Sequence, residues 1–378
     1  MNGLLRQAVK FAAVGGGATL IHVLAALTLN SLAHVAPLRA NFLAFLVASC
    51  VSYLKNKRGI ANVVLIGNSG GGALNGFFQA QAKKPKSQRI TKTPGGRRTH
   101  LNDAEMIPAD GLIYISTHKG EGMIMNEIID PSVVDETQPH LTDPALDMYD
   151  ERNGFKTPSR IDGSDAQWTR YDEAFVKRFR AAQIDRVKRI DAIARAMIAE
   201  NERAETLHND PDFAKLAPAK QREVLQREAF EPVMTIYRTM ANLHYVDNTQ
   251  DPSARDYGSI FSPRPDLMNW KFFGFGRQAT PHAWLSTWSG VSSQANQLHD
   301  LPHITEPSLF INAGKDQEIF PLTDAAPMFQ AIAAKDKTYV DFPNARHYFE
   351  PEFGAREAPD VEKVMDIVVP WIVERFGV

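Results

Sequence analysis

A single serine lies among glycines at residues 67–71, where the sequence reads Gly-Asn-Ser-Gly-Gly. This spacing fits Gly-x-Ser-x-Gly, in which the serine occupies a strained turn between a strand and a helix. A serine hydroxyl is a weak nucleophile at neutral pH unless a neighbouring base takes its proton. Ser69 is therefore a candidate nucleophile for acyl transfer, and it needs a base and an acid elsewhere in the chain.

Both partners follow Ser69 in the chain order serine, acid, histidine. Asp316 lies in a loop after the apolar run that begins at residue 307, and His347 lies in a loop after the run that begins at residue 337. About 30 residues separate the acid from the histidine, which leaves room for one helix between the two strands. The sequence therefore offers the three side chains that nucleophilic catalysis by serine requires.

Each of these residues also has a simpler interpretation. Ser69 fits a small turn residue, Asp316 fits a turn or the cap of the following helix, and His347 fits a surface histidine. His299 and His303 are rival bases, but both precede the strand that carries the acid. The catalytic interpretation applies to Ser69, Asp316 and His347 together or to none of them, because it depends on a single fold that brings all three side chains to one site.

The glycine-rich turn also has to be weighed against phosphate-binding loops. A nucleotide-binding P-loop ends in Gly-Lys-Ser/Thr, and no lysine lies near residues 67–76. A dinucleotide-binding Gly-x-Gly-x-x-Gly that starts at Gly67 would have Ser69 at its second glycine. The next strand also ends without an acid for a ribose. A nucleotide-binding module is therefore disfavoured.

Strands alternate with helices around these residues. Residues 60–66 predict a buried strand, residues 73–82 a helix and residues 112–116 a second strand. We expect glycine to be required two residues before and two residues after Ser69, because a Cβ there would meet the neighbouring backbone. Alternation of this kind predicts a parallel sheet with its functional residues at the carboxyl edge.

These motifs resemble those of the α/β-hydrolase superfamily over about residues 59–378. The matching segments are Gly-Asn-Ser-Gly-Gly at 67–71, residues 307–314 followed by Lys315-Asp316, and Asn-Ala-Arg-His at 344–347. The resemblance implies that Ser69 is the nucleophile, His347 the general base and Asp316 the group that orients it. The Gly70 N–H would be one oxyanion donor. It implies an esterase-like enzyme that forms an acyl-enzyme on a small ester and needs no cofactor.

The chain departs from this pattern before the nucleophile strand. An α/β-hydrolase has several strands there, and the loop after one of them supplies the second oxyanion N–H. Only 58 residues precede Gly59, and they contain no such loop. We therefore expect an α/β-hydrolase-like core without its first strands, a half-built oxyanion hole, impaired activity and an exposed sheet edge open to self-association.

The segment between the second strand and the acid strand predicts an insertion. Residues 165–248 are charged and helical in pattern, and a helical lid is expected over about 150–260. Residues 269–290 are rich in aromatics and either line an acyl pocket or pack the lid on the core. Residues 83–98 form a basic loop, which fits a solvated loop or a contact with anionic headgroups.

The first 58 residues have a different character. Two apolar runs, at 9–33 and 40–54, flank a short turn at 34–39. About 20 apolar residues cross a bilayer as a helix, so the pair predicts a transmembrane helical hairpin. A secretory signal peptide and a buried soluble hairpin are the alternatives. Basic residues precede the first run and follow the second, which places both ends of the hairpin and the remaining chain in the cytoplasm.

This segment resembles the first half of a GtrA-like membrane protein. The likeness rests on Phe-x-x-Val-Gly-Gly at 11–16, Thr19, His22, Asn41 with Phe45, and Ser-Tyr before Asn56-Lys57-Arg58. It implies a multi-pass protein of the inner or plasma membrane that moves lipid-linked sugars for polysaccharide biosynthesis, which is the alternative function of the chain. Such proteins have four membrane helices, whereas two fit here. The two resemblances meet near residues 57–60.

The net charge and the cysteine count limit the classes of ligand and partner that the chain is expected to bind. The formal net charge is −2, which gives no electrostatic case for nucleic acid. Cys50 is the single cysteine, so an internal disulfide framework and a multi-cysteine zinc site are excluded. No clustered ligands call for a metal. The expected partners are a small ester-like molecule and membrane lipid.

Overall fold

The computed structural model describes residues 42–351 and 357–377. The chain divides into two compact units, residues 1–39 and 40–378. The first unit, which contains the apolar run at 9–33, lies outside the described residues. The fold is therefore that of the second unit.

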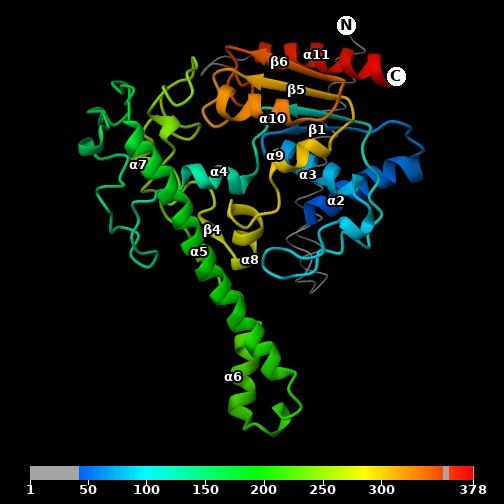
Figure 1. Ribbon diagram of the computed structural model, residues 1–378, viewed down its shortest axis with the longest axis vertical. Helices are drawn as coiled ribbons and strands as arrows, with labels where there is room; N and C mark the ends of the chain where they lie inside the picture. The colour runs from blue at the N-terminus through cyan, green and yellow to red at the C-terminus, as the bar shows by residue number, and fades with distance from the viewer. Residues whose placement is uncertain (1–41, 352–356, 378) are drawn as a thin grey trace. The chain divides into compact units, whose positions relative to one another are not determined.

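Four parallel strands form the central sheet in the order β1-β2-β5-β6 (Figure 1). The strands are β1 (Val64–Asn68), β2 (Gly111–Ile115), β5 (Ser308–Ala313) and β6 (Lys337–Phe342). The predicted parallel α/β sheet is confirmed. All four strands run in the same direction, so the loops that follow them meet at one edge, and this edge holds the candidate site.

The two central strands are buried on both faces, whereas the outer strands are half buried. Among the described residues β1 pairs with β2 alone, so its other side is the sheet edge that the sequence predicts. The predicted strand over 60–66 was placed too early, since β1 begins at Val64. Ile60 is exposed, and the Val63 N–H donates to the Asp110 carboxylate instead of entering the ladder.

Helices cover both faces of the sheet. On one face α11 (Pro359–Phe376) buries Val368 and Trp371 against Ile113 and Ile311. On the other face Tyr114 and Phe310 pack in the main core, together with residues from the helices that precede β5 and β6. The other helices of the sheet region are α3 (Gly70–Lys83), η9 (Pro321–Ala325) and α10 (Ala326–Ala331), and the short turn η3 (Lys86–Gln88) follows α3 in the chain.

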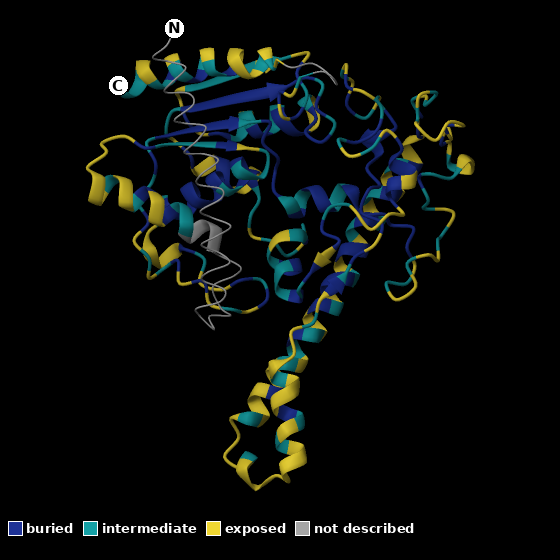
Figure 2. Ribbon diagram, turned by 180° about the vertical axis from the view of Figure 1, so that it is seen from behind, coloured by how far each residue is buried: buried dark blue, intermediate teal, exposed yellow. Residues whose placement is uncertain are grey.

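A long helical segment separates β2 from β5. Its 36-residue helix α5 extends away from the sheet and carries α6 at its far end, where exposed residues predominate (Figures 1 and 2). The elements of this segment are α4 (Glu121–Ile128), η4 (Glu151–Asn153), α5 (Glu173–His208), η5 (Phe213–Lys215), α6 (Pro218–Ala229), β3 (Met234–Thr235), η6 (Leu243–Tyr245), α7 (Pro265–Met268), β4 (Gln278–Ala279), α8 (Pro281–Ala283), η7 (Trp284–Trp288), α9 (Gln297–Asp300) and η8 (Leu301–His303).

The second apolar run forms the helix α2 (Phe42–Ser52) and the π-helical turn η2 (Tyr53–Lys57). Ala48 and Val51 are buried in a cluster with Val63 and Phe78. Within residues 42–351 and 357–377, no helix has both the length and the apolar character needed to cross a bilayer.

Candidate active site

Ser69 occupies the turn between β1 and α3. Its φ of 52° and ψ of −123° lie in a region that non-glycine residues rarely adopt. The Ser69 N–H donates to Ile115 O at 3.0 Å, and the Ser69 carbonyl accepts from Gly72 N at 3.1 Å. Backbone bonds to the neighbouring strand and to the first turn of α3 therefore hold the residue in this strained conformation.

The glycines around Ser69 have different reasons to be there. A Cβ on Gly67 would lie 2.5 Å from the Gly71 carbonyl carbon, so glycine is required at that position, as expected. A Cβ on Gly71 would meet nothing within 4 Å, and the expected clash there was wrong. The crowded position is Gly72, where a Cβ would overlap the Thr117 side chain. Close packing of α3 on the loop after β2, rather than the turn itself, selects this glycine.

Asp316 and His347 are brought together by the loops after β5 and β6. The His347 Nδ1–H donates to Asp316 Oδ2 at 2.7 Å, and the two side chains are at most 3% exposed. The other Asp316 oxygen accepts the N–H groups of Glu318 and Ile319 at 2.8 and 3.0 Å. The carboxylate thus makes a local turn and also fixes the imidazole orientation, so the turn and the catalytic interpretations of Asp316 are compatible.

The same two loops are joined by backbone bonds. Gly314 N donates to Phe342 O at 2.8 Å, and Lys315 N donates to Ala345 O at 2.9 Å. A Cβ on Gly314 would lie 2.6 Å from the Pro343 Cα, so the loops approach as closely as glycine permits. This explains how residues 31 apart in the chain share a buried hydrogen bond.

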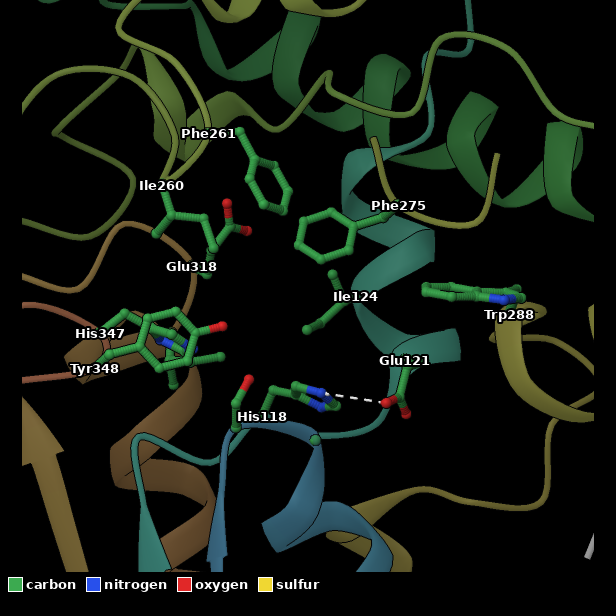
Figure 3. A pocket seen from close by; sticks show the side chains of 13 residues that line it. His118, Glu121, Ile124, Ile260, Phe261, Phe275, Trp288, Glu318, His347 and Tyr348 are labelled. Carbon is green, nitrogen blue, oxygen red and sulfur yellow. Dashed lines mark ion pairs between the residues drawn. The ribbon is translucent and has the colours of Figure 1, made fainter. Parts of the chain in front are cut away.

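Ser69, Gly70 and His347 line one pocket of about 190 Å³. Figure 3 shows His347 and Tyr348 on one side and Glu121 on the other, with the His118 ring at the base. The other side chains of the wall are Ile124, Ile260, Phe261, Phe275, Trp288, Glu318 and Ile319. No hydrogen bond joins the Ser69 hydroxyl to His347, although both belong to the described part of the chain.

Glu318 is a buried carboxyl group in the pocket wall. Burial raises its pKa to about 8, and the nearby Asp316 charge acts in the same direction. The Tyr245 hydroxyl donates to the two Glu318 oxygens at 3.0 and 2.8 Å, which partly opposes that rise in pKa. Glu318 is therefore mostly neutral at pH 7.

His118 and Glu121 are pocket residues that the sequence interpretation missed. They belong to the run Thr-His-Lys-Gly-Glu at 117–121, directly after β2. Burial alone would raise the pKa of Glu121, but the neighbouring His118 ring outweighs burial and lowers it. The available signal was position, because a loop that follows a central parallel strand opens at the carboxyl edge of the sheet.

The two alternative candidate bases, His299 and His303, lie away from the pocket. His299 and His303 lie in α9 and η8, are exposed, and do not line the pocket.

Across residues 42–351 and 357–377, no group of three or more histidine, cysteine, aspartate or glutamate side chains is arranged to hold a metal ion.

Solved structures similar to this chain include the following three. MenH from S. aureus is 13% identical with a TM-score of 0.31, over 88% of this chain and 76% of that chain. The monoacylglycerol lipase of Paleococcus ferrophilus is 13% identical with a TM-score of 0.33, over 88% and 76%. An α/β-fold family hydrolase from Bacillus anthracis str. Sterne is 10% identical with a TM-score of 0.31, over 89% and 75%.

The sequence comparisons concern the start of the chain. No curated protein matches the sequence. Residues 10–59 match the family model described as "GtrA/DPMS, transmembrane domain", which is the segment that resembles a GtrA-like protein in its motifs.

Proposed function

We propose that residues 59–378 form a serine hydrolase that cleaves an ester or a related acyl bond through an acyl-enzyme. The observation that carries this proposal is the buried hydrogen bond from His347 to Asp316, in the wall of the pocket that also contains the strained Ser69. A base with a fixed tautomer and an activated serine beside it are the requirements for nucleophilic acyl transfer.

The hydrogen-bond partners assign the proton transfers. Because Nδ1–H of His347 is donated to Asp316, the Nε2 lone pair is available to take the Ser69 proton. Oγ then attacks the carbonyl carbon, and the carbonyl electron pair moves to the oxygen. The Gly70 N–H, in the first turn of α3 and without an intrahelical partner, stabilises that oxyanion. The oxyanion then collapses, the bond to the alkoxy group breaks, and the leaving alcohol takes the proton from His347. In the second half, His347 takes a proton from water, the water oxygen attacks the acyl carbon, and the acid is released as Ser69 leaves with that proton.

The pocket supports a small, uncharged substrate. Its volume of about 190 Å³ is below the range of about 300–1,000 Å³ that is usual for drug-sized ligands. Most of its lining side chains are aliphatic or aromatic. Glu121 has a lowered pKa and is ionised at neutral pH, so it repels an anionic substrate. An ester with a short apolar acyl or alkyl group fits these conditions best.

The test is labelling of the full-length chain with a fluorophosphonate probe. We expect wild type and Ser87→Ala, which alters an exposed serine in η3, to label equally. Ser69→Ala should lose labelling and hydrolysis of 4-nitrophenyl acetate together. Equal labelling of Ser69→Ala and wild type would refute the assignment.

We also propose that residues 1–58 attach this enzyme to the inner or plasma membrane. The support is the match of residues 10–59 to a transmembrane family model. The chain should stay in the membrane fraction after alkaline carbonate washing, and release by that wash would contradict the proposal.

The same match supports a second candidate function, in lipid-linked sugar translocation. It predicts that the chain binds a lipid-linked sugar and that Ser69→Ala leaves binding intact. Absence of binding by wild type would remove this candidate.

A further inference from the structure

His118 stands directly beside the first turn of α3. It follows β2 by three residues, is buried, and lines the pocket with Ser69. A Cβ on Gly70 would lie 3.0 Å from His118 Nε2. A second imidazole therefore lies close to Gly70, the residue whose backbone N–H serves as the first oxyanion donor.

The proton on the His118 ring is located by its backbone neighbour. Gly120 N–H donates to His118 Nδ1 at 3.0 Å, so this nitrogen acts as an acceptor and carries no proton. In a neutral imidazole the proton then sits on Nε2. Nε2–H points to the pocket side, where its neighbours are Gly70 and the carboxylate of Glu121. His118 can donate a hydrogen bond into the pocket but has no free lone pair for a base.

The two donors are close enough to share one oxygen. The Gly70 nitrogen lies about 2.5 Å from its own Cβ position, so the nitrogens of Gly70 and His118 are within about 5.5 Å. Two N–H groups that each bind one oxygen at about 2.9 Å can be separated by up to about 5.8 Å. We propose that the His118 Nε2–H is the second oxyanion donor, which completes with a side chain the hole begun by the Gly70 amide. This proposal rests on the proposed serine hydrolase.

Glu121 occupies the neighbourhood of both donors in the resting structure. Its Oε1 lies 3.6 Å from His118 Nε2 and would lie 2.7 Å from a Cβ on Gly70. A carboxylate oxygen therefore lies beside both Gly70 and the His118 ring. Its negative charge opposes an oxyanion that forms between the two donors.

The loop that carries His118 is fixed in place. Lys119 Nζ pairs with Asp324 at 2.5 Å and with Glu127 at 2.6 Å, and the Lys119 carbonyl accepts from Gln297 N at 3.0 Å. Gly120 has a φ of 119°, and a Cβ there would lie 2.6 Å from Ala295 O. The donor is therefore preorganised, which is the condition for effective oxyanion stabilisation.

The experiment compares His118→Phe with His118→Gln in the full-length chain, with 4-nitrophenyl acetate as substrate. Phenylalanine keeps a ring but has no donor, and glutamine places an N–H near the position of Nε2. Loss of one oxyanion donor costs about 100- to 1,000-fold in kcat, so we expect that loss in His118→Phe with little change in KM. His118→Gln should recover at least about tenfold of the loss. Glu121→Gln, which removes the negative charge beside both donors, should be faster than wild type.

Binding of a trifluoromethyl ketone, which forms a tetrahedral adduct with the serine, gives a second readout. Its inhibition constant should rise in His118→Phe by the factor lost in kcat, whereas an uncleaved amide analogue should bind unchanged. A merely structural role for His118 would weaken both inhibitors.

The possible outcomes distinguish the donor role of His118 from the proposed serine hydrolase function on which it rests. If hydrolysis depends on Ser69 but His118→Phe keeps full kcat, or if Glu121→Gln is slower than His118→Phe, the donor role is overturned while the hydrolase stands. If Ser69→Ala hydrolyses the ester like wild type, the proposed function fails and the donor role with it. Circular dichroism of each variant checks that the fold is kept.

Discussion

The loops after β2 and β6 each bring one histidine to the same pocket, but different partners hold the two rings. In the β6 loop, His347 Nδ1 donates to a buried carboxylate, which leaves Nε2 as an acceptor. In the β2 loop, His118 Nδ1 accepts from a backbone N–H, which leaves Nε2 as a donor. The comparison teaches that the partner of the far nitrogen decides whether an imidazole acts as a base or as a hydrogen-bond donor.

The glutamates near the two rings also differ, because their pKa values are shifted in opposite directions. Glu121 faces His118, which lowers its pKa against the effect of burial. Glu318 follows Asp316 by two residues, and burial raises its pKa to about 8. One side of the pocket therefore carries an ionised carboxylate and the other a mostly neutral one at pH 7.

The largest effect is expected for His347→Ala. Under the proposed mechanism this variant loses the general base, so kcat should fall by about 10⁴- to 10⁶-fold, well beyond the loss expected for His118→Phe. Steady-state hydrolysis of 4-nitrophenyl acetate measures both. Added imidazole should restore part of the rate in His347→Ala and none in His118→Phe, and equal losses in the two variants would contradict the division of roles.

Asp316→Asn should give the next largest loss, about 10⁴-fold in kcat. The carboxamide can turn its N–H₂ to His347 Nδ1, and the ring then holds its proton on Nε2, as His118 does. The measurement is kcat at constant pH. Asp341→Asn is the matched control, since Asp341 accepts from Asn312 and does not contact His347. If both variants keep the wild-type rate, Asp316 does not set the tautomer.

Gly70→Ala should lower kcat by about 10- to 100-fold, since less than one full donor is lost. The new Cβ would lie 3.0 Å from His118 Nε2 and 2.7 Å from Glu121 Oε1, so both side chains must move. Gly71→Ala is the control, because its Cβ meets nothing within 4 Å. The measurements are kcat, KM and the unfolding temperature of the two variants. Unchanged kcat and KM in both would contradict the proposal that Gly70 and His118 together form the oxyanion hole.

The smallest effect concerns stability. The folded-state pKa of Glu318 is raised from 4.5 to about 8, so the folded chain binds this proton more tightly than the unfolded chain. The resulting stabilisation is present in full below pH 4.5 and is lost as the pH rises through about 8. Glu318→Gln should therefore flatten the fall in unfolding temperature between pH 5 and pH 9. Parallel curves for wild type and variant would show that Glu318 does not titrate in this way.

The strand, turn and helix around Ser69 could be predicted because each has a strong local signal. A β-branched apolar run, a Gly-x-Ser-x-Gly turn and an apolar helix follow one another within 25 residues. The order of Asp316 and His347 was equally readable, since each follows an apolar strand. The start of β1 was not, because the competing partner of Val63 is the Asp110 side chain, 47 residues away.

Other parts of the site depend on packing across the chain. Gly71 and Gly72 look alike in sequence, and only the position of Thr117 shows which one needs to be glycine. His118 belongs to no motif, and its proposed role rests on the hydrogen bond from Gly120 N and on its closeness to Gly70. Local pattern gives no access to such contacts, because they arise when distant segments pack.

Lys119 links this pocket to a constraint on how the sequence can change. Its ammonium group neutralises Glu127 from α4 and Asp324 from the β5–β6 crossover. Loss of the lysine alone would remove the ion-pair partner of two carboxylates, one of them buried, which is a strongly destabilising change. Substitutions of Lys119, Glu127 and Asp324 should therefore occur together in related sequences. Covariation between Lys119 and Asp324, which are about 200 residues apart, would indicate that this ion pair anchors the loop after β2.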